Sequence, residues 1–217
     1  MYVRPLRNAE PPIIPHERLE QFLTDVFHNF TELHAHHRRL IDRLHQIQRD
    51  EHPKIRSITS AIMDAALNFR EAYMEYIPNY PIAAYRIDEE IANNPDFKAF
   101  VTVMSILAIS DIINSWFSFL QHTVRHPDAH RLDMKNFINR PIPRLLRYEL
   151  LLNEILRETP SYDEDRRNIP DVIDLIKALG RETEPGVTSS KQKVELWRYN
   201  SNLVFKNGEH VVSTLTL

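Results

Sequence analysis

The sequence predicts an all-α protein built as a bundle of helices. Only three of the 217 residues are glycine, and none of the three precedes Gly180. Fourteen prolines are spread along the chain, and apolar residues recur at intervals of three and four over long stretches. Glycine-poor segments with this period form amphipathic helices, and prolines mark the turns between them. A hydrophobic content of 42% is enough to build a core.

The composition also excludes several classes of function. No glycine-rich phosphate-binding loop can exist before Gly180, so we expect no nucleotide site and no cofactor. The absence of cysteine removes thiol nucleophiles, disulfides and cysteine-ligated zinc. A net charge of -3 gives no overall basic field, and nucleic acid is therefore not an expected partner. No nucleophile, base and orienting group converge at a recognisable spacing, so we expect neither a hydrolase nor a metalloenzyme.

The first long helix is predicted from His16 to Asp50, between Pro15 and Pro53. Its apolar residues repeat at three and four, as they do in a helix with one buried face. Within it, His34 and His37 lie three residues apart on one face, a spacing that suits a metal ligand pair. No third ligand completes that set in an obvious way. We therefore favour a solvated, histidine-rich face.

A second apolar helix is predicted from Ile55 to Ile77, with a proline-marked break before the segment that follows. Tyr73 and Tyr76 are expected at the edge of the core, with their hydroxyls at the surface.

The apolar residues 102–124 allow three interpretations: an extended core helix, a membrane-touching segment, or an atypical insertion left by a retained intron. We favour the insertion, because Asp111 and several small polar residues make a spanning helix marginal.

A third helix follows Pro141 and Pro143, which fix φ for its first turn. Its leucines and other apolar residues cover more than half of the circumference, which predicts an inner helix packed on several sides. Four of its charged residues fall within a strip of about 80° that can face water or a partner. The strip consists of Arg144, Arg147, Glu154 and Glu158. Ion pairs between these arginines and nearby glutamates are the alternative interpretation.

The last helix is predicted after an acidic connector, Asp163 to Arg167, and has a regular buried stripe. The stripe consists of Ile169, Val172, Ile173, Ile176 and Leu179. The tail changes character, because Asn207-Gly208 between alternating β-forming residues predicts a short C-terminal β-hairpin. Two strands alone are marginally stable, so we expect this hairpin to be loosely held or docked on the helices.

The order of residues between Asn139 and Pro160 resembles the third conserved block of Dbl-homology domains, found in fungal-type and other Rho guanine-nucleotide exchange factors. The matching positions are Arg140-Pro141, Arg144, Arg147-Tyr148, Leu150-Leu151-Leu152 and Thr159-Pro160. Residues 69–100 are also similar to the family. The positions there are Tyr73, Tyr76, Tyr85, Asn94-Pro95-Asp96-Phe97 and Phe100.

The resemblance implies an elongated helical exchange domain over residues 1–196, with 102–124 as the insertion. Residues 197–217 would then open a pleckstrin-homology domain. The implied partner is a Rho-family GTPase, and the implied activity is promotion of GDP release without covalent chemistry. The implied GTPase-binding residues are Arg144 and Arg147, with Arg131 and Leu132 contributing to selectivity, and Thr183 at the position of a family asparagine.

The sequence departs from the family pattern at three points. It begins after the glutamate that the family carries in its first helix, Pro143 stands where many relatives have glutamine, and Thr183 replaces the asparagine. An exchange-inactive helical scaffold or GTPase-binding module is therefore the alternative function. Met1 to Asn8 contains no apolar run typical of a secretory signal. We expect a cytoplasmic protein, with peripheral recruitment to the plasma membrane as a further expectation.

Overall fold

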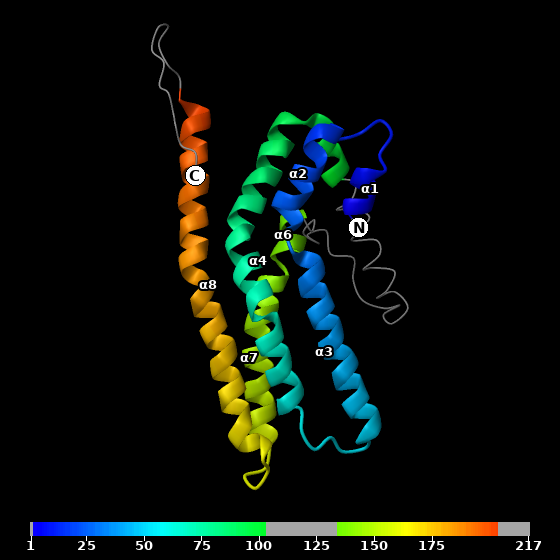
Figure 1. Cartoon of the computed structure of the whole chain (residues 1–217), viewed down its shortest axis with the longest axis vertical. Helices are drawn as coiled ribbons and strands as arrows, with labels where there is room; N and C mark the ends of the chain where they lie inside the picture. Colours follow the sequence, from blue (N-terminus) through cyan, green and yellow to red (C-terminus); the bar gives the residue numbers. More distant parts are fainter. Residues whose placement is uncertain (1, 103–133, 204–217) are drawn as a thin grey trace, which may run out of the picture.

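Helices α3, α4, α7 and α8 run along the length of an elongated molecule, which we describe from a computed structural model (Figure 1). The structure describes residues 2–102 and 134–203. The short helices α1, α2 and α6 gather toward one end. The bounds are α1 Val3–Arg7, α2 His16–Phe27, α3 Phe30–Asp50, α4 Thr59–Asn93, α6 Met134–Asn139, α7 Pro141–Glu158 and α8 Asp165–Asn202. These two ranges contain helices and no strand, which confirms the all-α, elongated bundle.

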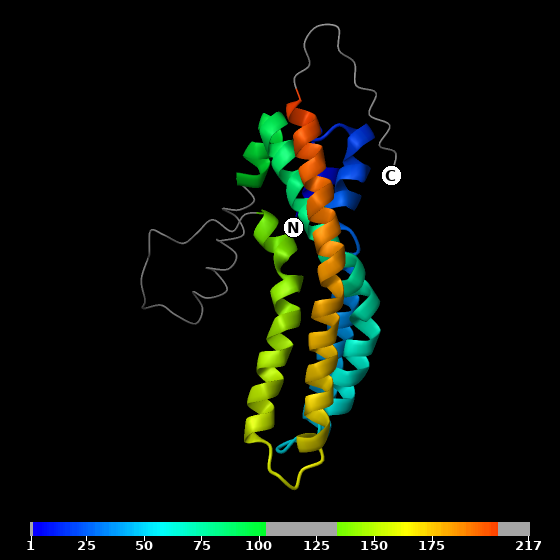
Figure 2. The same ribbon diagram turned by 90° about the vertical axis from the view of Figure 1, so that its left-hand side faces the viewer.

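Helix α4 is the centre of the bundle, because α2, α3, α6 and α8 all pack against it. In the view turned by 90°, α7 and α8 lie along one side of α4 (Figure 2). One buried cluster joins α3, the first half of α4, α7 and α8, and includes Phe69, Tyr73, Leu145 and Leu152. A second cluster joins α1, α2 and α6 to the other half of α4, and includes Leu6, Ile87 and Phe97. All five residues of the predicted stripe on α8 are buried, as the sequence predicts.

The prediction of one continuous helix from His16 to Asp50 was wrong. The chain breaks at His28, whose φ of 46° ends α2, and restarts at Phe30. The Asn29 side chain donates a hydrogen bond across to the carbonyl of Ala72 in α4, at 3.0 Å. Both helices keep the apolar spacing of three and four, so periodicity alone does not reveal the break.

The predicted break before Tyr85 was also wrong, because α4 continues through Pro78 and Pro81. Neighbouring side chains support the helix at this point. Asn79 in α4 donates a hydrogen bond to the carbonyl of Asp25 in α2, at 2.8 Å. Helix packing thus offsets the backbone hydrogen bonds that proline removes.

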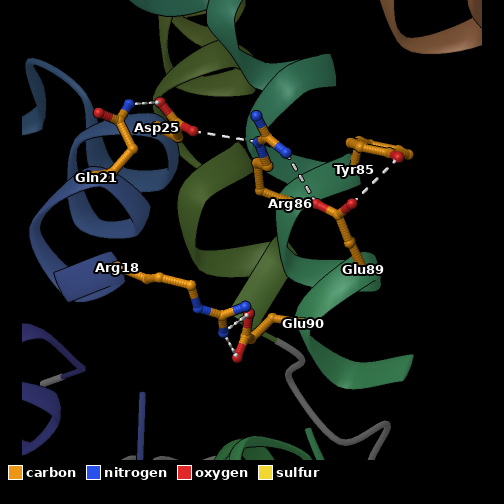
Figure 3. A network of polar contacts seen from close by, with 7 residues as sticks. All are labelled: Arg18, Gln21, Asp25, Tyr85, Arg86, Glu89 and Glu90. Carbon is orange, nitrogen blue, oxygen red and sulfur yellow. Dashed lines mark hydrogen bonds and ion pairs between the residues drawn. The ribbon is translucent and has the colours of Figure 1, made fainter. Parts of the chain in front are cut away.

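Charged side chains fasten α2 to α4 near the same end of the bundle (Figure 3). Glu90 is only 8% exposed, and Arg18 donates to both of its carboxylate oxygens, at 2.8 and 2.9 Å. Asn94 donates a further bond to Glu90, at 2.7 Å. In the same view, Arg86 bridges Asp25 of α2 and Glu89 of α4, at 3.1 and 2.9 Å. A buried carboxylate is tolerated here because its oxygens are paired.

Several sequence predictions fall outside the described residues. Most of the 102–124 segment and the Asn207-Gly208 hairpin belong to this group. Helix α8 continues beyond residue 196 to Asn202, and the domain boundary at 196 stays a prediction. Among the helices that the structure describes, none is both long and apolar enough to cross a membrane.

Gly186 in α8 lies against the Pro78 ring of α4, and replacing it with alanine should destabilise the fold. A Cβ at this position would lie 2.7 Å from Cγ of Pro78, so the two helices would have to move apart. We expect Gly186→Ala to lower the free energy of unfolding by about 1 to 3 kcal/mol, measured by urea denaturation.

Gly180→Ala is the matched control. A Cβ there has open space around it, so alanine should be neutral or stabilise the helix by up to about 1 kcal/mol. Equal stability of the two variants would contradict the proposed close contact.

Candidate partner-binding surface

Helix α7 is covered on one side only, so the prediction of an inner helix packed on several sides was wrong. Its buried residues are Leu145, Tyr148 and Leu152. Leu146, Leu150 and Leu151 are 57%, 64% and 51% exposed. Helix α8 packs against one flank, and among the described residues nothing covers the outward face. An apolar helix face left in water marks a site where another molecule can bind.

The charged strip of α7 faces solvent, as the sequence predicts. Arg144, Arg147, Glu154 and Glu158 are all exposed. The glutamates pair with Arg157 instead, at 2.5 and 3.3 Å. Within the part of the chain that the structure describes, the Arg147 guanidinium has no ion-pair or hydrogen-bond partner. Its five donors are therefore available to an incoming group.

Two of the exposed leucines lie beside Arg147 and were not among the predicted site residues. Leu146 precedes it, and Leu150 lies three residues further on, so that all three share the outward side of α7. We call Leu146, Arg147 and Leu150 the α7 patch. Arginine surrounded by exposed apolar side chains is a typical composition for the centre of a protein interface. Both leucines are adjacent to the charged strip in the sequence, and this position could have identified them as part of the surface.

The remaining predicted site residues lie elsewhere. Arg131 and Leu132 fall outside the described residues. Thr183 is 3% exposed, and its hydroxyl donates to the carbonyl of Gly180 at 2.7 Å. It lines a cavity of about 350 Å³ between α4, α7 and α8, together with Leu146. Thr183 is thus close to the α7 patch but offers a partner almost no surface, because its side chain points into the bundle.

The expectation of a solvated histidine face was wrong for His37. Its ring lies between α4 and α7, with Nε2 2.8 Å from the Tyr73 hydroxyl and Nδ1 2.9 Å from the Tyr148 hydroxyl. Tyr73 and Tyr76 also depart from prediction, because both are buried with their hydroxyls bonded inside the bundle. Among the described residues no group of side chains could hold a metal ion. The missed signal was that His37 shares a helix face with Leu33, Leu40 and Leu44.

Burial shifts the pKa of each member of this cluster toward its neutral form. It lowers the pKa of His37 to about 4, an effect to which the charges of Arg144, His36 and His34 add. It also raises the pKa of Tyr73 and of Tyr148, while the nearby Arg144 opposes the rise for both tyrosines. The Arg144 guanidinium lies 4.8 Å from the centre of the Tyr148 ring, a cation–π contact. His37 and both tyrosines are therefore neutral at physiological pH.

Comparison with known proteins matches most of the chain to a known domain family. The family model described as the RhoGEF domain matches residues 1–183. The chain is 26% identical over 214 residues to Rho1 guanine nucleotide exchange factor 2 of Schizosaccharomyces pombe, and the aligned region covers 99% of this chain and 16% of that protein. It is 27% identical over 197 residues to Rho1 guanine nucleotide exchange factor 1 of the same organism, and this aligned region covers 91% of the chain and 13% of that protein. The chain thus spans a sixth or less of the length of these curated relatives.

Solved structures show the same fold. The DH/PH domain of human ARHGEF11, in a ternary complex with human RhoA and its inhibitor, matches with a TM-score of 0.68 and 16% identity, over 92% of this chain and 50% of that one. The DH/PH domains of PDZ-RhoGEF, in complex with activated RhoA, match with a TM-score of 0.67 and 17% identity, over 94% and 51%. At these identities the likeness establishes the arrangement of helices.

The lowered pKa of His37 predicts that stability falls with acidification. The unfolded chain titrates this histidine near 6.5, whereas the folded chain does so near 4. Between these values the unfolded state binds a proton that the folded state does not, so the free energy of unfolding decreases as pH falls from about 6.5 to 4. We expect this residue to contribute about 1 to 2 kcal/mol of that decrease, after allowance for its partial exposure.

Urea denaturation at several pH values measures this contribution. His37→Phe should flatten the dependence of stability on pH across that window, relative to the unmodified chain. His45→Phe, which changes an exposed histidine of the same helix, should keep the original dependence. An unchanged slope in His37→Phe would rule out His37 as the source.

Proposed function

Because the chain belongs to the RhoGEF domain family, we propose that it promotes nucleotide exchange on a Rho-family GTPase. The observation that carries the proposal is the α7 patch, in which an exposed arginine without a partner among the described residues lies beside two exposed leucines. The relatives named as Rho1 guanine nucleotide exchange factors and the neighbours solved with RhoA support the same partner class.

The proposed activity requires differential binding and no covalent chemistry. The domain would bind the GTPase more tightly without nucleotide than with it, and this difference would favour release of GDP. A shift of a two-state equilibrium from 1:99 to 99:1 requires a roughly 10⁴-fold difference in affinity, about 5.5 kcal/mol. The side chains of this chain supply contacts only, while the nucleotide and its metal ion belong to the partner.

Each residue of α7 in the proposal makes a contact that suits its chemistry. The planar fork of Arg147 suits carboxylates or backbone carbonyls of the partner. Leu146 and Leu150 would exclude water around it, which strengthens a charged contact. Arg144 would make a second contact from its place over the Tyr148 ring.

Three further residues of the proposal lie outside α7. Arg131 and Leu132 contribute to selectivity. Thr183 acts from inside the bundle, where it lines the same cavity as Leu146.

A binding module without exchange activity is the alternative within the same partner class. Pro143 at a position where many relatives carry glutamine, and buried Thr183 at the asparagine position, favour it. Binding of a nucleotide-free GTPase without faster GDP release would establish that alternative. We also propose a cytoplasmic location, with peripheral recruitment to the plasma membrane.

Arg147→Ala should reduce exchange without affecting the fold. The residue is exposed and makes no described intramolecular ion pair, so its loss removes only contacts to the partner. We expect release of fluorescent GDP from a panel of Rho-family GTPases to slow by about 10-fold. This corresponds to the loss of about 1 to 2 kcal/mol of interaction free energy from one interface arginine. Arg157→Ala is the control, because Arg157 lies on the same helix but pairs with Glu154 and Glu158. Equal loss in both variants, or none in either, would refute the role of Arg147.

Leu150→Ser tests the apolar part of the α7 patch. Its side chain is 64% exposed, so serine should cost little stability but should weaken binding of the nucleotide-free GTPase by about 5- to 30-fold. Leu67→Ser is the matched control, since Leu67 is 55% exposed on α4. Affinity measured by isothermal titration should fall for Leu150→Ser alone. A similar fall in both variants would show that the patch has no special role.

A further inference from the structure

The side chain of His37 joins three helices, α3, α4 and α7. It projects from α3, contacts Tyr73 of α4 through Nε2 at 2.8 Å, and contacts Tyr148 of α7 through Nδ1 at 2.9 Å. Its ring also packs on Phe69 of α4, with the ring centres 5.5 Å apart. Both ring nitrogens therefore have a partner, and each partner belongs to a different helix.

The hydrogen-bond directions in this cluster follow from the number of protons. The Tyr73 hydroxyl lies 3.2 Å from the carbonyl of Pro141, which can only accept, so Tyr73 donates its single proton there. The Tyr73 oxygen must then accept from His37, which places the histidine proton on Nε2. Nδ1 is left as an acceptor for the proton of Tyr148. One neutral tautomer of His37, with its proton on Nε2, therefore satisfies all three hydrogen bonds. The bond from Tyr73 to Pro141 also holds the start of α7.

Tyr148 in turn fixes Arg144. The tyrosine is 6% exposed, and its hydroxyl is bonded to His37, so its ring has one orientation. The Arg144 guanidinium lies 4.8 Å from the centre of that ring. Within residues 2–102 and 134–203, Arg144 has no carboxylate partner that could hold it otherwise. It also lines an open pocket of about 350 Å³ between α3 and α7, beside His37 and Tyr148.

We infer that His37 is a positioning residue for the proposed exchange activity: through Tyr148 it holds the guanidinium of Arg144 in the orientation that meets the GTPase. His37 itself does not touch the partner. The inference rests on the proposed function, because it assigns to Arg144 a contact with the GTPase. It extends that function to a residue on a different helix, one that the α7 sequence alone does not reveal.

A double-mutant cycle separates positioning from general stability. His37→Phe removes both hydrogen bonds but keeps an aromatic ring against Phe69. We expect it to lower kcat/KM for GDP release by about 3- to 10-fold, and Arg144→Ala by about 10-fold. If His37 acts through Arg144, the double variant should match Arg144→Ala. Multiplied losses in the double variant would overturn the inference.

Two further variants test the hydrogen bonds themselves. His37→Gln can accept from Tyr148 through Oε1 and donate to Tyr73 through Nε2, so it should recover much of the activity that phenylalanine loses. Tyr148→Phe keeps the ring under Arg144 but removes the hydroxyl, which bonds to His37 and interacts with Arg144, and it should lose at least as much as His37→Phe. Should His37→Phe not fold, Tyr148→Phe in the same cycle with Arg144→Ala replaces it. Greater activity in the phenylalanine variant than in the glutamine variant at position 37 would contradict the inference.

The orientation of Arg144 can also be measured without any GTPase. Relaxation of the Nε–Hε group of Arg144 reports its mobility in the isolated chain. The group should be ordered in the unmodified protein and in His37→Gln, and mobile in Tyr148→Phe and His37→Phe, while the backbone of α7 is unchanged. An Arg144 signal that is the same in all four proteins would overturn the inference. A chain in which Arg144 responds as expected but GDP release is not accelerated would instead refute the proposed function.

Discussion

Burial of the aromatic side chains of α4 is the constraint on which the rest of the bundle depends. Phe69 and Tyr73 are fully buried, and α3, α7 and α8 all contribute to the cluster around them. The hydroxyls of the buried tyrosines bond to His37 and to carbonyls at the start of α7 and the end of α6, so apolar packing and polar satisfaction agree. The orientation of α7 follows from these contacts.

A fixed α7 explains how the protein combines a stable fold with an apolar surface. The buried side of the helix supplies the contacts that hold it, and the outward side is left free for Leu146, Arg147 and Leu150. The exposed leucines and Arg147 add little to folding, but a rigid helix presents them to a partner with little loss of conformational entropy on binding. The same helix therefore stabilises the bundle with one face and forms the proposed binding surface with the other.

The second cluster holds the other end of the bundle by different means. Charged residues join α2 to α4 around Glu90 and Arg86, in addition to apolar contacts from α1, α2 and α6. Ion pairs of this kind require defined geometry, because a buried carboxylate without partners is costly. Gly186 lets α8 pass close to Pro78 near the middle of α4. Both features hold a neighbouring helix in close contact with α4.

Periodicity and residue order are enough to predict the class of fold, the family, the buried stripe of α8 and the exposed charged strip of α7. Features that depend on neighbouring segments follow only from the packed structure. Only the three-dimensional structure shows that half of the leucines on α7 face water, that α2 ends at Phe27, and that Thr183 points inward. His37 illustrates the difference most clearly. Its spacing suggested a solvated histidine, but two tyrosines from distant segments make it a half-buried, neutral link between helices.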